Sequence, residues 1–377
     1  MNNMPLTPGN NLGKNSSNSR RSIYLALMLL LVTVVVSSML YYIKGEKEQT
    51  TSPAHPLSTV LTDTPKSVIK GQKISDNSAN TSAVNKVDSG LYNKYLAHVI
   101  NGDSSGKWPV NAAFPRAGAI FPFKRVVAFY GNLYSKQMGI LGELPPGQML
   151  AKLQGEIKKW QLADTAIEVI PALHYIATTA QMSPGTGRKY RLRMPFHQID
   201  SVMAMAKRIN AIVFLDIQVG LSTLQEEIPS LEKYLVMPNV HLGIDPEFSM
   251  KTGAAPGKVV GTFDAKDVNY ASTYLAGLVT KYNLPPKVLV VHRFTQGMLT
   301  NYKQISTRPE VQLVIDMDGW GSPARKLDTY KQYVYKEPVQ FTGFKLFYKN
   351  DTKSKGNMLT PAELLKLRPQ PVYIQYQ

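Results

Sequence analysis

The chain alternates short apolar runs with longer stretches in which apolar residues recur every three or four positions. The short runs have the length of buried strands, and the longer stretches have the period of helices that cover a sheet. We expect strands at 125–131, 166–173, 211–217, 240–244, 259–263, 287–292, 311–316 and 342–347. We expect helices at 146–162, 199–209, 221–235, 265–282, 296–305, 324–333 and 361–367. Strands and helices in alternation indicate an α/β protein with a parallel sheet.

Eight strands with helical spacers favour a single closed (β/α)₈ barrel of the TIM type over an open doubly wound sheet. Residues 111–377 come close to the roughly 250 residues that such a barrel needs. The connection after the fourth strand is rich in Gly, Ala and Pro, so we expect the fourth helix to be short or missing. Residues 372–374 are expected to add an apolar extension against the barrel.

An uninterrupted span without charge, residues 23–43, is long enough to cross a bilayer as a helix. Basic residues precede it, which predicts a single-pass anchor with a cytoplasmic N-terminus and an extracytoplasmic barrel. A cleaved secretion signal is the alternative, although such signals have shorter apolar cores of roughly 7–15 residues. We expect residues 1–22 to be a disordered cytoplasmic tail, and the polar stretch 44–110 to be a flexible linker.

The chain carries 43 Lys and Arg against 26 Asp and Glu, a net charge of +17. An excess of this size outside a membrane indicates acidic neighbours, namely anionic lipid head groups or anionic wall polymers. Nucleic acid is not expected as a partner, because no nucleic-acid-binding motif appears. The absence of cysteine excludes disulfides, thiolate catalysis and a lipid anchor on cysteine. No G-x-G-x-x-G follows the first strand, and no cofactor is expected.

Pairs of polar residues, two positions apart, stand at the ends of three predicted strands. The pairs are Asp216 with Gln218, Asp245 with Glu247, and Asp316 with Asp318. Residues two apart on a strand point to the same side, and active sites of these barrels lie at the carboxyl ends of the strands. Glycoside hydrolysis needs one carboxyl group as acid and another as base or nucleophile. The structural alternative is that these carboxylates cap helices or pair with Lys and Arg.

We expect Glu247 to be the general acid/base and Asp245 to orient or stabilise it. Asp318, or else Asp216, is expected to supply the second carboxylate. The expected substrate-binding residues are Tyr130, Gln218, His292, Asp316, Trp320 and Lys345. Among these, the rings of Trp320 and Tyr130 are expected to stack against sugar faces. The alternatives are a structural role for His292, an ion pair between Lys345 and a neighbouring aspartate, and ordinary packing of the aromatic rings.

Metal-binding motifs and a basic loop also bear on the chemistry. No H-x-H or H-E-x-x-H motif occurs, so no metal site is expected, although Asp and His residues at several strand ends can still bind a divalent ion. The loop 183–193 carries four cations, Arg188, Lys189, Arg191 and Arg193. They either steer a polyanionic substrate or form a solvated charge run.

The domain resembles a group of uncharacterised secreted proteins and lipoproteins of actinobacteria and related bacteria. The resemblance covers 120–377 and rests on the motifs VAFYGN, MGILGE, LDIQVG, HLGIDPEF, LPPKVLVVHRF, VQLVIDMDGWG, GFKLFY and VYIQYQ. It implies a glycosidase-like TIM barrel without naming an activity, and the chain departs from the lipoproteins in its lack of cysteine. Asp245-Pro246-Glu247 also resembles the Asp-x-Glu pattern of barrel-fold glycoside hydrolases, including some lysozymes. The acidic motif on the first strand of the lysozyme group is absent.

The sequence therefore predicts a membrane-anchored, outward-facing barrel that is glycoside-hydrolase-like and acts on cell-envelope or extracellular polysaccharide. Two alternatives stay open. One is a non-catalytic envelope protein that binds carbohydrate or serves as a scaffold. The other is a metal-dependent hydrolase of phosphate or acyl esters.

Overall fold

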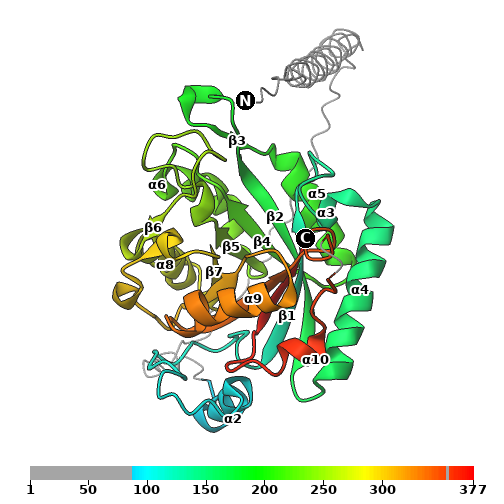
Figure 1. The fold of residues 1–377 in the computed structure, drawn as a ribbon. Helices are drawn as coiled ribbons and strands as arrows, with labels where there is room; N and C mark the ends of the chain where they lie inside the picture. Colours follow the sequence, from blue (N-terminus) through cyan, green and yellow to red (C-terminus); the bar gives the residue numbers. More distant parts are fainter. Residues whose placement is uncertain (1–86, 354–355) are drawn as a thin grey trace, which may run out of the picture. The chain divides into compact units, whose positions relative to one another are not determined.

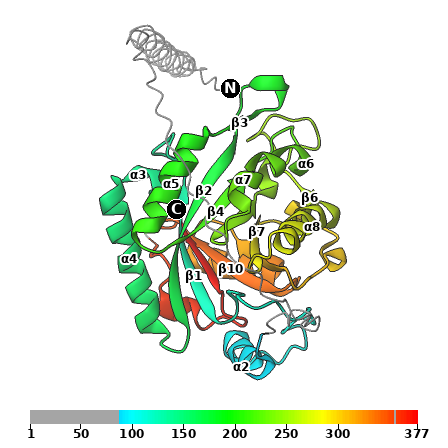
Figure 2. The ribbon, with the colours of Figure 1, turned by 180° about the vertical axis from the view of Figure 1, so that it is seen from behind.

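The computed structural model describes residues 87–353 and 356–377, and its centre is a closed barrel of eight parallel strands (Figures 1 and 2). The barrel strands are β1 (Lys124–Gly131), β2 (Glu168–Ala180), β4 (Ile212–Ile217), β5 (Val240–Ile244), β7 (Lys287–Arg293), β9 (Val311–Met317), β10 (Phe341–Leu346) and β11 (Tyr373–Tyr376). The ring closes because β1 pairs with β11 on one side and with β2 on the other. The predicted TIM-type barrel is confirmed.

Helices surround the barrel, with α4 and α5 against β2 and α8 against β7. The helices are α2 (Ser89–Ile100), α3 (Ile140–Glu143), α4 (Pro146–Ala163), α5 (Phe196–Arg208), α6 (Leu224–Glu227), α7 (Glu232–Leu235), α8 (Ala265–Lys281), α9 (Pro323–Tyr330) and α10 (Pro361–Leu364). Short 3₁₀ turns are η2 (Thr186–Arg188), η3 (Pro229–Leu231), η4 (Pro246–Phe248), η5 (Gln296–Met298) and η6 (Tyr302–Gln304), and η7 (Lys331–Tyr335) is a π-helical turn. The predicted helix 221–235 is thus divided between α6, η3 and α7, and 296–305 forms η5, the short strand β8 (Leu299–Thr300) and η6 instead of a helix.

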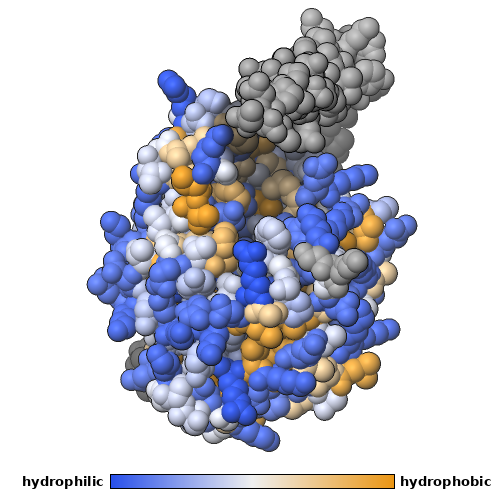
Figure 3. Space-filling model, viewed as in Figure 1, coloured by the Kyte–Doolittle hydropathy of each residue, from blue (hydrophilic) through white to orange (hydrophobic). Residues whose placement is uncertain are grey.

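The strands are apolar on both faces because they separate two layers of core. Alternate residues of β1 show this: Val127 and Phe129 pack outward under the helices, whereas Val126 and Ala128 pack inside the barrel. All four side chains are fully buried. Hydrophilic residues dominate the outer face that Figure 3 shows, as expected for helices with one buried and one solvated side.

One predicted barrel strand is wrong, and another segment takes its place. In the predicted strand 259–263 only Phe263 is in a strand, β6 (Phe263–Asp264), which pairs with β8 (Leu299–Thr300) outside the barrel, and Val259 and Val260 are exposed. No helix forms in the described segment between η4 and β6 to return the chain as a parallel strand. The eighth strand is β11, which includes part of the predicted extension 372–374.

The expected tail 1–22, the anchor 23–43 and most of the linker 44–110 lie outside the described residues. Across 87–353 and 356–377, none of the helices combines the length and apolar character needed to cross a bilayer. Part of the linker range is described, and there α2 forms with Asp88 as its N-cap. Val99 of α2 packs with Phe121 in the apolar cluster that also fills the barrel interior.

A hairpin arm extends from the barrel where β3 (Arg191–Arg193) pairs antiparallel with the end of β2. Three of its four cations are held by α6: Arg191 and Arg193 each lie 2.7 Å from the buried Glu227 carboxylate, and Lys189 lies 3.1 Å from Glu226. These three side chains therefore hold the arm against α6, and none of them lines the cavity described below.

Candidate active site

A cavity of about 440 Å³ opens at the carboxyl ends of the barrel strands. The predicted site residues that line it are Tyr130, Gln218, Asp245, Glu247, Asp318, Trp320 and Lys345. They come from β1, β10 and the segments that follow β4, β5 and β9. The structure therefore brings together seven side chains that are as far apart in the sequence as Tyr130 and Lys345.

Glu247 lies on η4, and its backbone is fixed from two sides. The Asp245 carboxylate accepts a hydrogen bond from the Glu247 N–H at 3.0 Å, and the Glu247 carbonyl accepts one from Gly261 N–H at 2.6 Å. Gly261 is necessary for this approach, because a Cβ there would lie 2.5 Å from the Pro246 carbonyl oxygen. The segment 259–263, which was predicted to be a barrel strand, thus positions Glu247 instead.

The Gln218 side chain connects Asp245 to the end of β2. Its side-chain amide donates to Asp245 Oδ2 at 3.2 Å, and its oxygen accepts from Ala180 N–H at 3.1 Å. The Glu247 carboxyl group, by contrast, forms no hydrogen bond or ion pair with any described residue. A half-buried carboxyl group that lines a cavity and has no partner in the described part of the chain is available to a ligand.

The surroundings of Glu247 and Asp318 push their pKa values in opposite directions. Burial, followed by the nearby Asp318 charge, raises the pKa of Glu247 to about 7, and Lys345 and His292 offset only part of that rise. Burial would also raise the pKa of Asp318, but Lys345 and His292 outweigh it, so that pKa lies below its usual value. Lys345 Nζ lies 3.0 Å from Asp318 Oδ1, which is the ion pair foreseen as an alternative.

The two predicted stacking rings differ in access. Trp320 is 52% exposed at the cavity rim, whereas Tyr130 is 3% exposed and its ring lies 3.9 Å from Lys345 Nζ. The Tyr130 hydroxyl donates to Asp216 Oδ2 at 2.9 Å. Tyr130 is therefore part of the cavity floor, and Trp320 is the exposed ring, with the Arg325 guanidinium over it at 5.6 Å from the ring centroid.

Three predicted site residues, Asp216, His292 and Asp316, are fully buried and do not line the cavity. His292 Nδ1 lies 3.2 Å from Asp318 Oδ2 and 3.3 Å from Asp316 Oδ2. The buried cluster of Asp216, His292 and Asp316 is therefore connected to the cavity through Asp318. Direct contact with a substrate, as predicted for His292 and Asp316, is not available from this position. Asp216 is buried at the same depth, and its carboxylate contacts Tyr130 and does not line the cavity. Asp216 is therefore not placed to serve as the second carboxylate.

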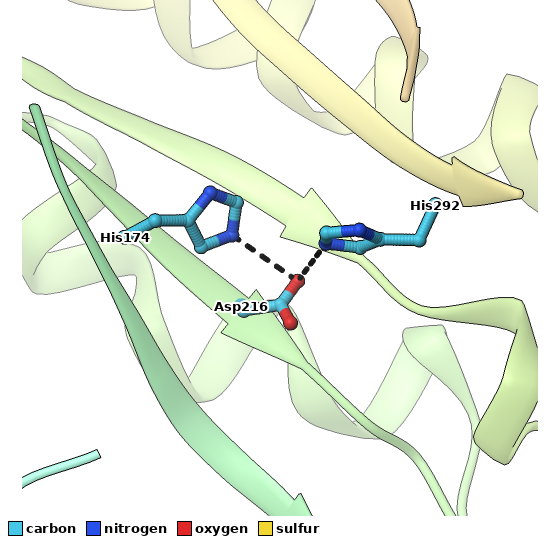
Figure 4. Close-up of side chains that lie close together, drawn as sticks. All are labelled: His174, Asp216 and His292. Atoms are coloured by element: carbon cyan, nitrogen blue, oxygen red, sulfur yellow. Dashed lines mark ion pairs between the residues drawn. The ribbon is translucent and has the colours of Figure 1, made fainter. Parts of the chain in front are cut away.

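His174 on β2 belongs to this buried group and was missed by the sequence analysis. Its Nε2 lies 3.4 Å from Asp216 Oδ1, and His292 Nε2 lies 3.6 Å from the same oxygen (Figure 4). Burial lowers the pKa of His174 to about 4, against a smaller opposing effect of Asp216. The sequence signal for His174 is its position directly after the predicted strand 166–173, because His292 likewise stands at the end of a predicted strand.

The fold and the cavity define the class of protein, a TIM-type barrel with carboxylates at the carboxyl ends of its strands. No family model matches the chain, and a search of curated proteins also gave no match. The chemistry is therefore argued from the geometry of the cavity.

Proposed function

We propose that the protein is a glycoside-hydrolase-like enzyme that acts on cell-envelope or extracellular polysaccharide. The observation that carries the proposal is the unpartnered Glu247 carboxyl group, which lines the cavity and whose pKa is raised to about 7. A carboxyl group of this kind is protonated in a useful fraction at neutral pH and can give its proton to a leaving glycosidic oxygen.

The other parts of the reaction follow from the neighbours of Glu247. Asp318, paired with Lys345, supplies the second carboxylate as base or nucleophile. Asp245 holds the Glu247 backbone and acts as a positioning residue. Trp320 offers an apolar surface to a sugar ring at the rim.

The proposed location rests on the sequence. Residues 23–43 would anchor the chain in the cell membrane with its N-terminus in the cytoplasm, and the resemblance to secreted proteins and lipoproteins agrees with an extracytoplasmic barrel. The net charge of +17 favours an anionic glycan or wall polymer as the partner, with lipid head groups nearby.

The test is an assay of glycan cleavage with the full-length chain. We expect purified envelope polysaccharides to gain reducing ends with the wild type, and Glu247→Gln to release none above background. Glu168→Gln is the matched control, since Glu168 is an exposed residue paired with Lys124 at the opposite end of the barrel. If no polymer is cleaved while wild type and Glu247→Gln bind one equally tightly, the protein is a carbohydrate-binding protein and the enzymatic proposal is wrong.

Trp320→Ala is expected to raise KM for the cleaved glycan about fivefold and to leave kcat nearly unchanged, because a stacking surface worth about 1 kcal/mol binds substrate and transition state alike. Trp320→Phe should recover most of the affinity. Steady-state kinetics on both variants checks this. A fall in kcat at constant KM would instead place Trp320 in the chemical step.

A further inference from the structure

We propose that His174, Asp216 and His292 bind one divalent metal ion with the ligand preference of Zn²⁺ inside the barrel, below the cavity floor. The three residues come from β2, β4 and β7, and Figure 4 shows their side chains pointing toward one another. One ligand atom from each lies within 4.8 Å of the other two. The argument for this ion does not rest on the proposed glycosidase reaction, although His292 contacts the Asp318 carboxylate of the cavity.

The two distances from the Asp216 carboxylate to the histidine rings suit a tetrahedral ion. Asp216 Oδ1 lies 3.4 Å from His174 Nε2 and 3.6 Å from His292 Nε2. In a tetrahedral Zn²⁺ site with bonds of about 2.0–2.1 Å, neighbouring ligand atoms are about 3.4 Å apart. Two imidazole nitrogens and one carboxylate oxygen form a donor set for Zn²⁺ and similar ions, whereas Ca²⁺ and Mg²⁺ prefer oxygen alone.

The three atoms that face this centre have no hydrogen-bond partner in the part of the chain that the structure describes. They are His174 Nε2, His292 Nε2 and Asp216 Oδ1, and all three side chains are fully buried. Unsatisfied buried polar atoms are uncommon in native proteins, because each loses its hydrogen bonds to water without a replacement. Three of them around one point indicate a ligand that all three share.

The atoms that face away from the centre have neighbours of the kind found behind metal ligands. The pairs are His174 Nδ1 with Tyr373 Oη at 2.5 Å, His292 Nδ1 with Asp318 Oδ2 at 3.2 Å, and Asp216 Oδ2 with Tyr130 Oη at 2.9 Å. The hydrogen bonds of His174 and Asp216 orient these two side chains, whereas His292 Nδ1 lies near Asp318 without a hydrogen bond. When His174 Nδ1 donates to the Tyr373 hydroxyl, its Nε2 is left for the metal. The pair between His292 and Asp318 also links the proposed ion to the carboxylate of the cavity.

Gly243 on β5 keeps space open beside the ligand atoms. A Cβ at this position would lie 2.4 Å from both Asp216 Oδ1 and His174 Nε2, so no other residue fits without moving them. Charge balance points the same way, because in the part of the chain that the structure describes the buried carboxylates of Asp216, Asp316 and Asp318 form an ion pair with one ammonium group, that of Lys345. An imidazolium at His292 would reduce this excess but would leave His174 Nε2 without a partner.

The experiment measures metal binding by the full-length chain, purified without a histidine tag and treated with a chelator. We expect one Zn²⁺ per chain after reloading, a rise in Tm of roughly 5 °C at about a hundredfold excess over Kd, and no rise with Ca²⁺. Cobalt added in place of zinc should give the visible absorption of a four-coordinate ion with nitrogen and oxygen ligands. A reloaded wild type that holds far less than one ion per chain would overturn the proposal, and this measurement needs no variant.

Variants then locate the ion. His174→Ala is expected to lose both the bound ion and the rise in Tm. His241→Ala is the matched control, because His241 is another buried histidine of the barrel interior that lies outside the cluster, and it should keep one ion per chain. If His174→Ala does not fold, the cobalt spectrum of the wild type decides between four-coordinate binding and its absence. Full binding by a folded His174→Ala would show that the ion is elsewhere.

Discussion

Replacing Asp164 with alanine is expected to lower the free energy of unfolding by about 3–5 kcal/mol. The Arg125 guanidinium is fully buried at the base of the barrel, 2.8 Å from Asp164 Oδ2. Its remaining hydrogen bonds, to Gln370 Oε1 and the Pro371 carbonyl, go to neutral acceptors. The variant would therefore bury an uncompensated positive charge, and denaturant unfolding of the full-length chain measures the cost.

The control is the neighbouring pair between Lys124 and Glu168, at the same end of the barrel. These two side chains are 40% and 60% exposed, so Glu168→Ala is expected to cost less than about 1 kcal/mol. Equal losses for the two variants would mean that solvent reaches Arg125 and that the buried pair does not hold this end of the barrel together.

Most of the barrel could be predicted because buried parallel strands have a distinctive sequence. Runs such as 287–292 and 311–316 are mostly apolar and buried along their whole length, since they face helices on one side and the barrel interior on the other. Residues 259–263 share that composition but lack a preceding helix, and parallel pairing depends on such a crossover. The C-terminal strand Tyr373–Tyr376 was predicted only as the apolar extension 372–374, because that apolar run is just three residues long; the strand continues through Gln375, which lies in the barrel among polar partners.

The sequence could predict at which end of the barrel the candidate site lies, but not how deeply each of its side chains is buried. Strand ends meet at one edge of a barrel, so Asp245, Glu247 and Asp318 were expected together, and they line one cavity. Asp216 and Asp316 occupy similar sequence positions, but each lies before the last residue of its strand and points into the interior below. Side chains two residues apart on a strand lie in successive layers of the barrel interior. No sequence pattern in this chain shows which of the two layers opens into the cavity.

Glu247→Gln is expected to stabilise the protein at pH 8 by on the order of 2 kcal/mol and to change its stability little at pH 4. The pKa of Glu247 is raised from 4.5 to about 7 in the folded chain. Between these two values the folded state keeps a proton that the unfolded state releases, so rising pH favours unfolding of the wild type. The glutamine variant has no proton to lose and does not incur this loss.

The charged groups that face Glu247 are Asp318 after β9, Lys345 on β10, His292 on β7 and Asp245 at the end of β5. All four remain in the variant, so the difference in unfolding free energy between wild type and Glu247→Gln, measured across the pH range, isolates the Glu247 proton. The same titration would make glycan cleavage fall as pH rises through about 7, because the proton donor is then ionised. A stability difference that does not change with pH would show that the pKa of Glu247 is the same in the folded and unfolded chain, so that the group is ionised at neutral pH and is not the general acid there.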